Sequence, residues 1–150
     1  MIEQGNPAPD FELRSDSGET VKLSDFRGQP VVLYFYPKDD TPGCTTEACE
    51  FRDAYDVFRE RGAEVLGVSP DDVASHGKFK SKYELPFTLL ADPEHEVAEK
   101  YGVWGERSSY GKTSMGITRS TFIIDKDGNI ARAMLGIKPA GHAQEVLESL

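Results

Sequence analysis

Two cysteines, Cys44 and Cys49, are the side chains of this sequence best suited to chemistry, and they lie only five residues apart. An apolar and aromatic run at 31–36 precedes them and is typical of a buried strand. Residues 47–61 follow, and their composition favours a helix. Cys44 therefore falls at or near a helix N-terminus, where unpaired N–H groups and the helix dipole favour negative charge. A thiol in that position is shifted toward the thiolate, the form that attacks electrophiles.

The spacing of the two cysteines bears on whether they can form a disulfide. If both residues lie in one regular helix, their Cα atoms are about 8.6 Å apart. A disulfide requires Cα atoms within about 7 Å of each other. The spacing therefore argues against a static structural bridge. It permits a bridge that forms only after Cys44 has reacted and the helix has opened.

The residues just before Cys44 suit the approach of a small ligand. Gly43 lets the backbone come close to a ligand without interference from a side chain. Thr41 places a hydroxyl three residues before the thiol, within reach of either the thiolate or a substrate oxygen. Residues 45–47, Thr-Thr-Glu, resemble a helix start.

Composition limits the class of protein. With 150 residues, 38% hydrophobic and 29% charged, the chain fits one ordinary domain, 1–150, with a proper core. Its formal net charge of −9 argues against a nucleic-acid partner, which needs a basic face. No apolar run approaches the roughly 20 residues of a membrane span, and residues 1–6 lack signal-peptide features. We therefore expect a cytoplasmic protein, in which two cysteines are more often reactive or metal-binding than structural.

The hydrophobic pattern predicts strands that alternate with helices. We expect a short hairpin from residues 11–13 and 20–23, and then a helical turn at 24–28. Further strands are expected at 31–36, 64–69 and 87–91, with helices at 47–61, 71–83 and 92–101.

The C-terminal third departs from this alternation of strands and helices. Residues 104–118 are rich in Gly, Ser and charged residues and predict a long loop. Residues 120–125 and 129–135 predict a hairpin closed by Asp127-Gly128, and 143–150 predict a final helix. This order of elements indicates an α/β protein with a mixed central sheet and helices on both faces.

The cysteine segment resembles the active-site motif of the peroxiredoxins, Pro37-x-x-x-Thr41-x-x-Cys44. The longer run at 41–53, TPGCTTEACEFRD, is similar to the peroxiredoxin Q branch, also called bacterioferritin comigratory protein. Further similarity to this branch is found at 100–105, 110–112 and 119–125, so that the resemblance covers essentially the whole chain.

The resemblance implies a thioredoxin-like fold and a role for each of five residues. Cys44 is implied as the peroxidatic nucleophile and Cys49 as the resolving cysteine of the same chain. Pro37 is implied to shield the pocket, and Thr41 to hydrogen-bond the peroxide. Arg119 is implied to stabilise both thiolate and peroxide, which suits a guanidinium with a permanent charge and several fixed donors.

The resemblance also implies a reaction cycle. Cys44 attacks a peroxide and becomes a sulfenic acid, and Cys49 then condenses with it to give a disulfide. A dithiol reductant, thioredoxin by family resemblance, restores both thiols. No metal or organic cofactor is needed, and members of this branch are often monomers. Cys49 could instead be an inert core residue of the helix.

Two alternative functions deserve comparison with the peroxidase. A thiol–disulfide oxidoreductase of thioredoxin type uses cysteines two residues apart, and this sequence has no Cys-x-x-Cys. A non-enzymatic redox sensor would open its helix on oxidation and change a partner contact, without catalytic turnover. We rank the peroxidase first, the oxidoreductase second and the sensor third.

Other polar features predict structure rather than chemistry. We expect His76, His95 and His142 to be ordinary surface residues, because they have no metal-ligand spacing with the cysteines. Residues 125–129 partly match a calcium loop, but the glycine is misplaced and the closing glutamate is missing, so we expect a hairpin turn.

Two points stay open from the sequence. Glu47 either fixes the helix start or contacts Arg119. Trp104, Tyr110 and Met115 either line a substrate pocket or pack the long loop.

Overall fold

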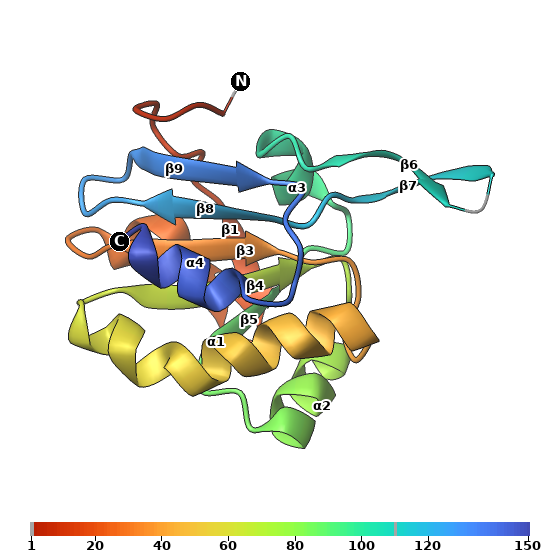
Figure 1. Ribbon diagram of the computed structural model, residues 1–150, viewed down its shortest axis with the longest axis horizontal. Coiled ribbons are helices and arrows are strands. Elements are labelled where there is room, and N and C mark those ends of the chain that lie inside the picture. The colour runs from red at the N-terminus through yellow and green to blue at the C-terminus, as the bar shows by residue number, and fades with distance from the viewer. Residues whose placement is uncertain (1, 110) are drawn as a thin grey trace.

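A mixed sheet forms the centre of the computed structural model, which describes residues 2–109 and 111–150 (Figure 1). Within these residues seven strands run in the order β2-β1-β5-β4-β3-β8-β9. β3 (Val31–Phe35) lies inside the sheet, parallel to β4 (Glu64–Ser69) and antiparallel to β8 (Ser120–Ile124). The other strands of the sheet are β1 (Glu12–Ser15), β2 (Thr20–Lys22), β5 (Thr88–Ala91) and β9 (Ile130–Leu135).

Both faces of the sheet are covered, as the alternation of side chains on β3 requires. Val32 and Tyr34 belong to one hydrophobic cluster, whereas Leu33 and Phe35 belong to the other. The first cluster contains side chains from the helices α1 (Pro42–Glu60), α2 (Val73–Tyr83) and α4 (His142–Glu148). The second contains side chains from the N-terminal segment, the 3₁₀ helix η1 (Leu23–Phe26) and α3 (Glu96–Lys100).

Most of the predicted elements are confirmed. The N-terminal hairpin is β1 with β2, and it joins the sheet because β1 also pairs with β5. The predicted strands at 31–36, 64–69 and 87–91 correspond to β3, β4 and β5. The helix α1 begins at Pro42, earlier than the predicted residue 47, because proline fits the first helical position. Cys44 therefore lies inside the first turn.

The prediction of a long loop at 104–118 is wrong. Residues 104–109 and 112–117 pair as antiparallel strands, β6 (Trp104–Ser109) and β7 (Lys112–Ile117), which project from the body of the molecule (Figure 1). The strands carry mostly small and polar residues, so the sequence lacks the hydrophobic alternation that would have predicted them. Trp104 stacks on His95 with ring centroids 3.8 Å apart, which favours packing over a substrate pocket. Met115 is exposed, and Tyr110 lies outside the described residues.

The prediction that the histidines lie on the surface is also wrong for two of the three. His76 and His142 are buried, at 0% and 2% exposed. Each has polar partners inside the protein: His76 contacts Asp39, and Nε2 of His142 lies 2.7 Å from the Thr121 hydroxyl. Hydrogen bonds of this kind make the burial of a polar ring possible.

The turn at 125–129 is a hairpin turn, as predicted. The side chain of Asp125 accepts hydrogen bonds from the backbone N–H groups of Asp127 and Asn129, and Gly128 has a φ of +87°. This turn joins β8 to β9.

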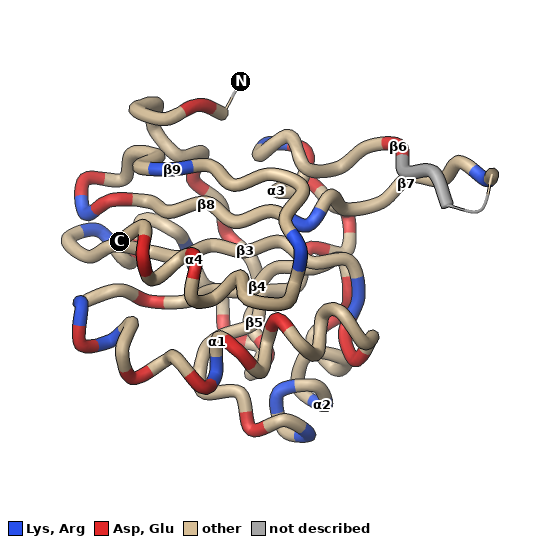
Figure 2. The backbone as a smooth tube through the Cα atoms, viewed as in Figure 1, with Lys and Arg blue, Asp and Glu red and all other residues tan. Residues whose placement is uncertain are grey.

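Charge is dispersed over the described part of the chain. Figure 2 shows Lys and Arg interspersed with Asp and Glu along the backbone, consistent with the excess of acidic residues in the sequence. Among the residues described, no helix combines the length and the apolar character needed to cross a membrane.

Close packing between β3 and β4 generates a testable prediction. A Cβ atom on Gly67 would lie 2.8 Å from Cζ of Tyr34 and 3.0 Å from Cδ2 of Leu89, both inside the core. We expect Gly67→Ala to lower the free energy of unfolding by about 1–3 kcal/mol, because neighbouring side chains must shift. Urea unfolding monitored by circular dichroism measures this change.

The matched control is Gly77→Ala in α2. There the added Cβ meets only the Asp16 backbone oxygen, at an ordinary 3.5 Å. Alanine in a helix interior is expected to raise stability by about 0.5–1 kcal/mol. If Gly67→Ala were as stable as the original chain, the packing described for this strand pair would be incorrect.

Candidate active site

Cys44 lies in the first turn of α1 and is almost completely buried, at 1% exposed. Thr41 is the N-cap residue of this helix, in an extended conformation with φ −97° and ψ 155°. The helix begins because Pro42 pre-sets a helical φ and because Thr45 N–H donates to the Thr41 carbonyl at 2.8 Å. The N–H groups of this first turn point along the helix axis, which favours negative charge at its start.

Arg119 brings a positive charge to the sulfur from a distant part of the chain. It stands between β7 and β8, and its Nη2 donates to Cys44 Sγ at 3.4 Å. Its carbonyl accepts a hydrogen bond from Ile137 N–H, which fixes the backbone at this point. A Cβ atom on Gly43 would lie 3.1 Å from Nη2, so glycine leaves room for the guanidinium. The structure therefore brings Arg119 and Cys44 together.

Glu47 shares the same guanidinium, which settles the question left open by the sequence. Its Oε1 accepts a hydrogen bond from Arg119 Nη1 at 2.8 Å, and its side chain is fully buried. The second carboxylate oxygen, Oε2, has no hydrogen-bond partner among the described residues. One cation thus faces both a sulfur and a carboxylate.

Burial and the ion pair shift the pKa of Glu47 in opposite directions. Burial raises the pKa of Glu47, and Arg119 lowers it; burial is the larger effect, and the pKa is raised from 4.5 to about 7. For Arg119, burial lowers the pKa of the guanidinium, but its contacts with Glu47 and Cys44 outweigh burial and raise it. Arg119 therefore stays charged, whereas Glu47 changes its charge near neutral pH.

Thr41 and Pro37 lie in the loop that connects β3 to α1. The Thr41 hydroxyl donates to the Lys38 carbonyl at 2.9 Å, which commits its proton and leaves its oxygen free to accept. Both Thr41 and Pro37 are half-buried. This loop is short and follows the buried strand directly. Thr41 is its last residue, so it lies at the start of α1.

Cys49 is half-buried on α1, and both cysteines are free thiols. The helix is continuous from Pro42 to Glu60, so its geometry keeps the two residues about 8.6 Å apart at Cα. A side-chain bond from Thr46 Oγ1 to the Pro42 carbonyl, 3.0 Å long, reinforces the first turn. The structure therefore shows the separated arrangement that the spacing predicted.

Sequence reasoning missed three residues near this site: Asp39, His76 and Pro139. Pro139 Cγ would lie 3.5 Å from a Cβ on Gly43, so the segment after β9 borders the helix start. Asp39 reaches the buried His76 from the loop before Thr41. The one available signal was that His76 and Phe79 are three residues apart, the spacing of a buried helix face.

Comparison with known proteins places the chain in a family. The family described as AhpC/TSA matches residues 4–133. Peroxiredoxin Bcp of Bacillus subtilis is 55% identical over 149 residues, which are 99% of this chain and 95% of that protein. Peroxiredoxin Bcp of Escherichia coli is 46% identical over 149 residues, 99% of this chain and 96% of that protein.

Solved structures agree with these sequence relatives. A cysteine-to-serine mutant of peroxiredoxin Q from Xylella fastidiosa superposes with a TM-score of 0.93 at 37% identity, covering 99% of this chain and 94% of that chain. The bacterioferritin comigratory protein of Xanthomonas campestris superposes with a TM-score of 0.91 at 37% identity, covering 98% of this chain and 96% of that chain.

The resemblance drawn from the cysteine motif and the thioredoxin-like fold expected from it are thus both confirmed. Because the match extends over nearly the whole chain in sequence and in structure, this chain belongs to the AhpC/TSA family and, within it, to the thiol peroxidases of the peroxiredoxin Q or Bcp branch.

Proposed function

We propose that Cys44 is the attacking thiol of this peroxidase. The observation that carries the proposal is the hydrogen bond from Arg119 Nη2 to Cys44 Sγ at the N-terminus of α1. The thiolate attacks one oxygen of the O–O bond, which breaks and leaves Cys44 as a sulfenic acid. The leaving oxygen takes up a proton and departs as water or as an alcohol.

Arg119, Thr41 and Pro37 are proposed to hold the peroxide. The guanidinium has fixed donors that stabilise negative charge as it moves from sulfur to the leaving oxygen. Because the Thr41 proton is already donated to Lys38, its oxygen is suited to accept the peroxide O–H. Pro37, half-buried in the same loop, shields the reacting atoms from water.

Cys49 is proposed to resolve the sulfenic acid within the same chain. The helix must first unwind between the two cysteines, which breaks the Thr45–Thr41 backbone bond and the Thr46–Pro42 side-chain bond. The Cys49 sulfur then attacks the Cys44 sulfur, a disulfide forms, and the hydroxyl leaves as water. Thioredoxin or a similar dithiol reduces the disulfide by exchange.

The family supports a proposal for the substrates and the setting. Hydrogen peroxide and organic hydroperoxides are the proposed substrates, and alkyl peroxide reduction activity is attributed to the Xanthomonas relative. We propose that residues 1–150 act as one domain, a monomer in the cytoplasm, without metal or organic cofactor. Both hydrophobic clusters of the described residues pack on one sheet, which supports a single domain.

Serine variants of the two cysteines test the assigned roles. We expect Cys44→Ser to abolish peroxide consumption, because no other thiol lies at the helix start. Cys49→Ser should retain one stoichiometric round and lose turnover with thioredoxin, thioredoxin reductase and NADPH. Peroxide consumption and NADPH oxidation measure the two effects. Turnover at the original rate in Cys44→Ser would contradict the assignment.

The raised pKa of Glu47 predicts how stability depends on pH. The unfolded chain releases this proton near the usual pKa of 4.5, whereas the folded protein holds it to about pH 7. Because the folded state binds more protons in that window, the contribution of Glu47 to the free energy of unfolding falls as pH rises from about 4.5 to about 7. We expect Glu47→Gln to make this fall shallower, as measured by urea unfolding across the window.

Glu60→Gln is the matched control, because Glu60 is an exposed glutamate at the end of the same helix. It should leave the pH dependence as in the original chain. Equal pH dependence in Glu47→Gln and the original chain would refute the raised pKa.

A further inference from the structure

The loop between β3 and α1 is fastened to α2 by a buried carboxylate, that of Asp39. Its Oδ1 accepts a hydrogen bond from the Tyr36 hydroxyl at 2.5 Å. Its Oδ2 accepts one from Ser75 Oγ and lies 2.7 Å from His76 Nδ1. The Asp39 side chain is 4% exposed and that of His76 is 0% exposed. The contact between the two side chains is therefore buried.

The ring of His76 bridges the loop and the central sheet. His76 Nδ1 faces the Asp39 carboxylate, and Nε2 lies 2.9 Å from the Leu90 carbonyl oxygen. Burial raises the pKa of Asp39, but the hydrogen bonds that it accepts, first from His76, outweigh burial and lower it. An ionised carboxylate and a carbonyl can only accept, so the buried ring of His76 is held between two acceptors, one on the loop and one on β5.

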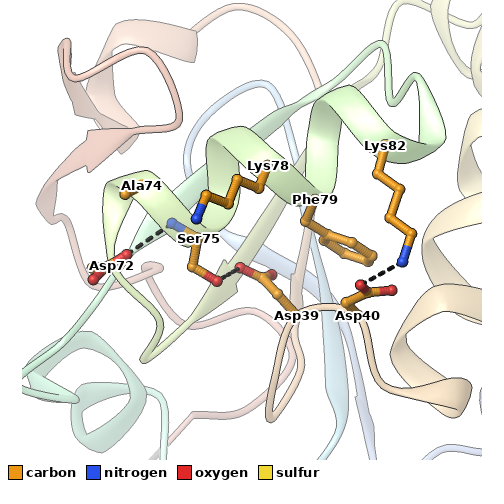
Figure 3. Close-up of a pocket in the computed structure, with 8 residues that line it drawn as sticks. All are labelled: Asp39, Asp40, Asp72, Ala74, Ser75, Lys78, Phe79 and Lys82. Atoms are coloured by element: carbon orange, nitrogen blue, oxygen red, sulfur yellow. Dashed lines mark hydrogen bonds and ion pairs between the residues drawn. The ribbon is translucent and has the colours of Figure 1, made fainter.

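The next residue of the loop, Asp40, makes a second connection to α2. Its carboxylate accepts hydrogen bonds from Lys82 Nζ and from the Tyr83 hydroxyl, both at 2.7 Å. Asp40 has a φ of +57°, a left-handed conformation that aspartate tolerates directly before the N-cap of α1. Figure 3 shows Asp39 and Asp40 reaching α2 from the loop, around a pocket of about 420 Å³.

The same helix also contacts α1 beyond the cysteines. Arg52 Nη1 donates to the Tyr83 carbonyl at 2.9 Å. α2 therefore contacts the chain at residues 39 and 40, before the reactive segment, and at residue 52, after it. The turns that carry Cys44 and Cys49, and that must unwind for a disulfide, lie between these contacts. We call the contacts of Asp39 with His76 and of Asp40 with Lys82 and Tyr83 the loop anchor.

Stability alone is a weak reason for a buried carboxylate and imidazole at this place. Taking a carboxylate out of water costs free energy that its hydrogen bonds only partly return, and apolar replacements of such buried polar groups are often as stable. What such a pair supplies is a fixed geometry. Here the fixed element is the loop that sets the position of Thr41 and, one turn later, Cys44.

We propose that the loop anchor is a positioning element for the peroxidase reaction, which holds Thr41 and Cys44 in the arrangement that attacks peroxide. This inference rests on the proposed function of Cys44. The loop anchor lies outside the turns that unwind, so it stays closed while the disulfide forms. Its loss therefore slows oxidation of Cys44 and leaves the later joining of Cys44 with Cys49 unhindered.

The test separates the two steps in a single turnover. Reduced protein is mixed with hydrogen peroxide and quenched at short times with a thiol-blocking reagent. The intact mass of the protein is then measured. The reduced, sulfenic acid and disulfide forms then differ in mass and in the number of blocked thiols. The time courses give one rate constant for Cys44 oxidation and another for disulfide formation.

His76→Gln removes the imidazole that faces Asp39, and the double variant Lys82→Gln/Tyr83→Phe removes the exposed contacts of Asp40. We expect His76→Gln to slow Cys44 oxidation by about tenfold to a hundredfold, since small misplacements of reacting groups have effects of that size. The double variant should slow it by about threefold to tenfold on the same reasoning. The rate constant for disulfide formation should not fall in either variant.

Lys80→Gln is the matched control on the same helix. It breaks the ion pair of Lys80 with Asp16, at 3.2 Å, which does not involve the loop. Both rate constants should stay within about twofold of the original chain, as for most changes away from a site. The double variant alters only groups near the surface, so it decides the question if His76→Gln does not fold.

Three results distinguish the possible failures. Oxidation of Cys44 within about twofold of the original rate in the double variant and in any folded His76→Gln protein would overturn the positioning role. Equal slowing of both steps would overturn it as well, because general loosening would then explain the data. If the unaltered chain left Cys44 unoxidised, the proposed function itself would fail, whatever the variants did.

Discussion

The Arg119 guanidinium, buried between the Cys44 sulfur and the Glu47 carboxylate, is the interaction on which the site depends. A cation reaches this position only because a strand start, a helix start and a glycine meet there. β8 follows Arg119 directly and pairs with β3, the strand that leads to α1. Gly43 leaves space for the guanidinium that any Cβ would narrow. The sheet thus brings together two residues that are 75 positions apart in sequence.

In the proposed cycle, the first turns of α1 are subject to two opposing requirements. They must be intact to place Cys44 at the helix N-terminus against Arg119, and they must open for Cys49 to reach it. The chain is attached to α2 on either side of these turns. Asp39 and Asp40 bind α2 before them, and Arg52 binds α2 after them. A segment with fixed ends and few internal side-chain bonds is suited to local unwinding without wider disruption.

Local features of the sequence predicted the strand before Cys44, the helix after it and the separation of the two thiols. These depend on apolar runs, helix propensity and fixed helix geometry, which act over short distances. The β6–β7 strand pair escaped prediction because its pairing rests on backbone bonds between polar residues. His76 and His142 escaped because their partners, Asp39 and Thr121, are distant in sequence. The contact between Glu47 and Arg119 could not be predicted for the same reason, because the two residues are distant in sequence.

The central claim is that Cys44 reacts with peroxide and that Cys49 then joins it within one chain. The most direct test is the intact mass of the reduced protein seconds after addition of one equivalent of hydrogen peroxide. The account predicts the loss of two hydrogen atoms, with no covalent dimer. A lasting gain of one oxygen would contradict the role of Cys49, and an unchanged mass would contradict the peroxidase site as a whole.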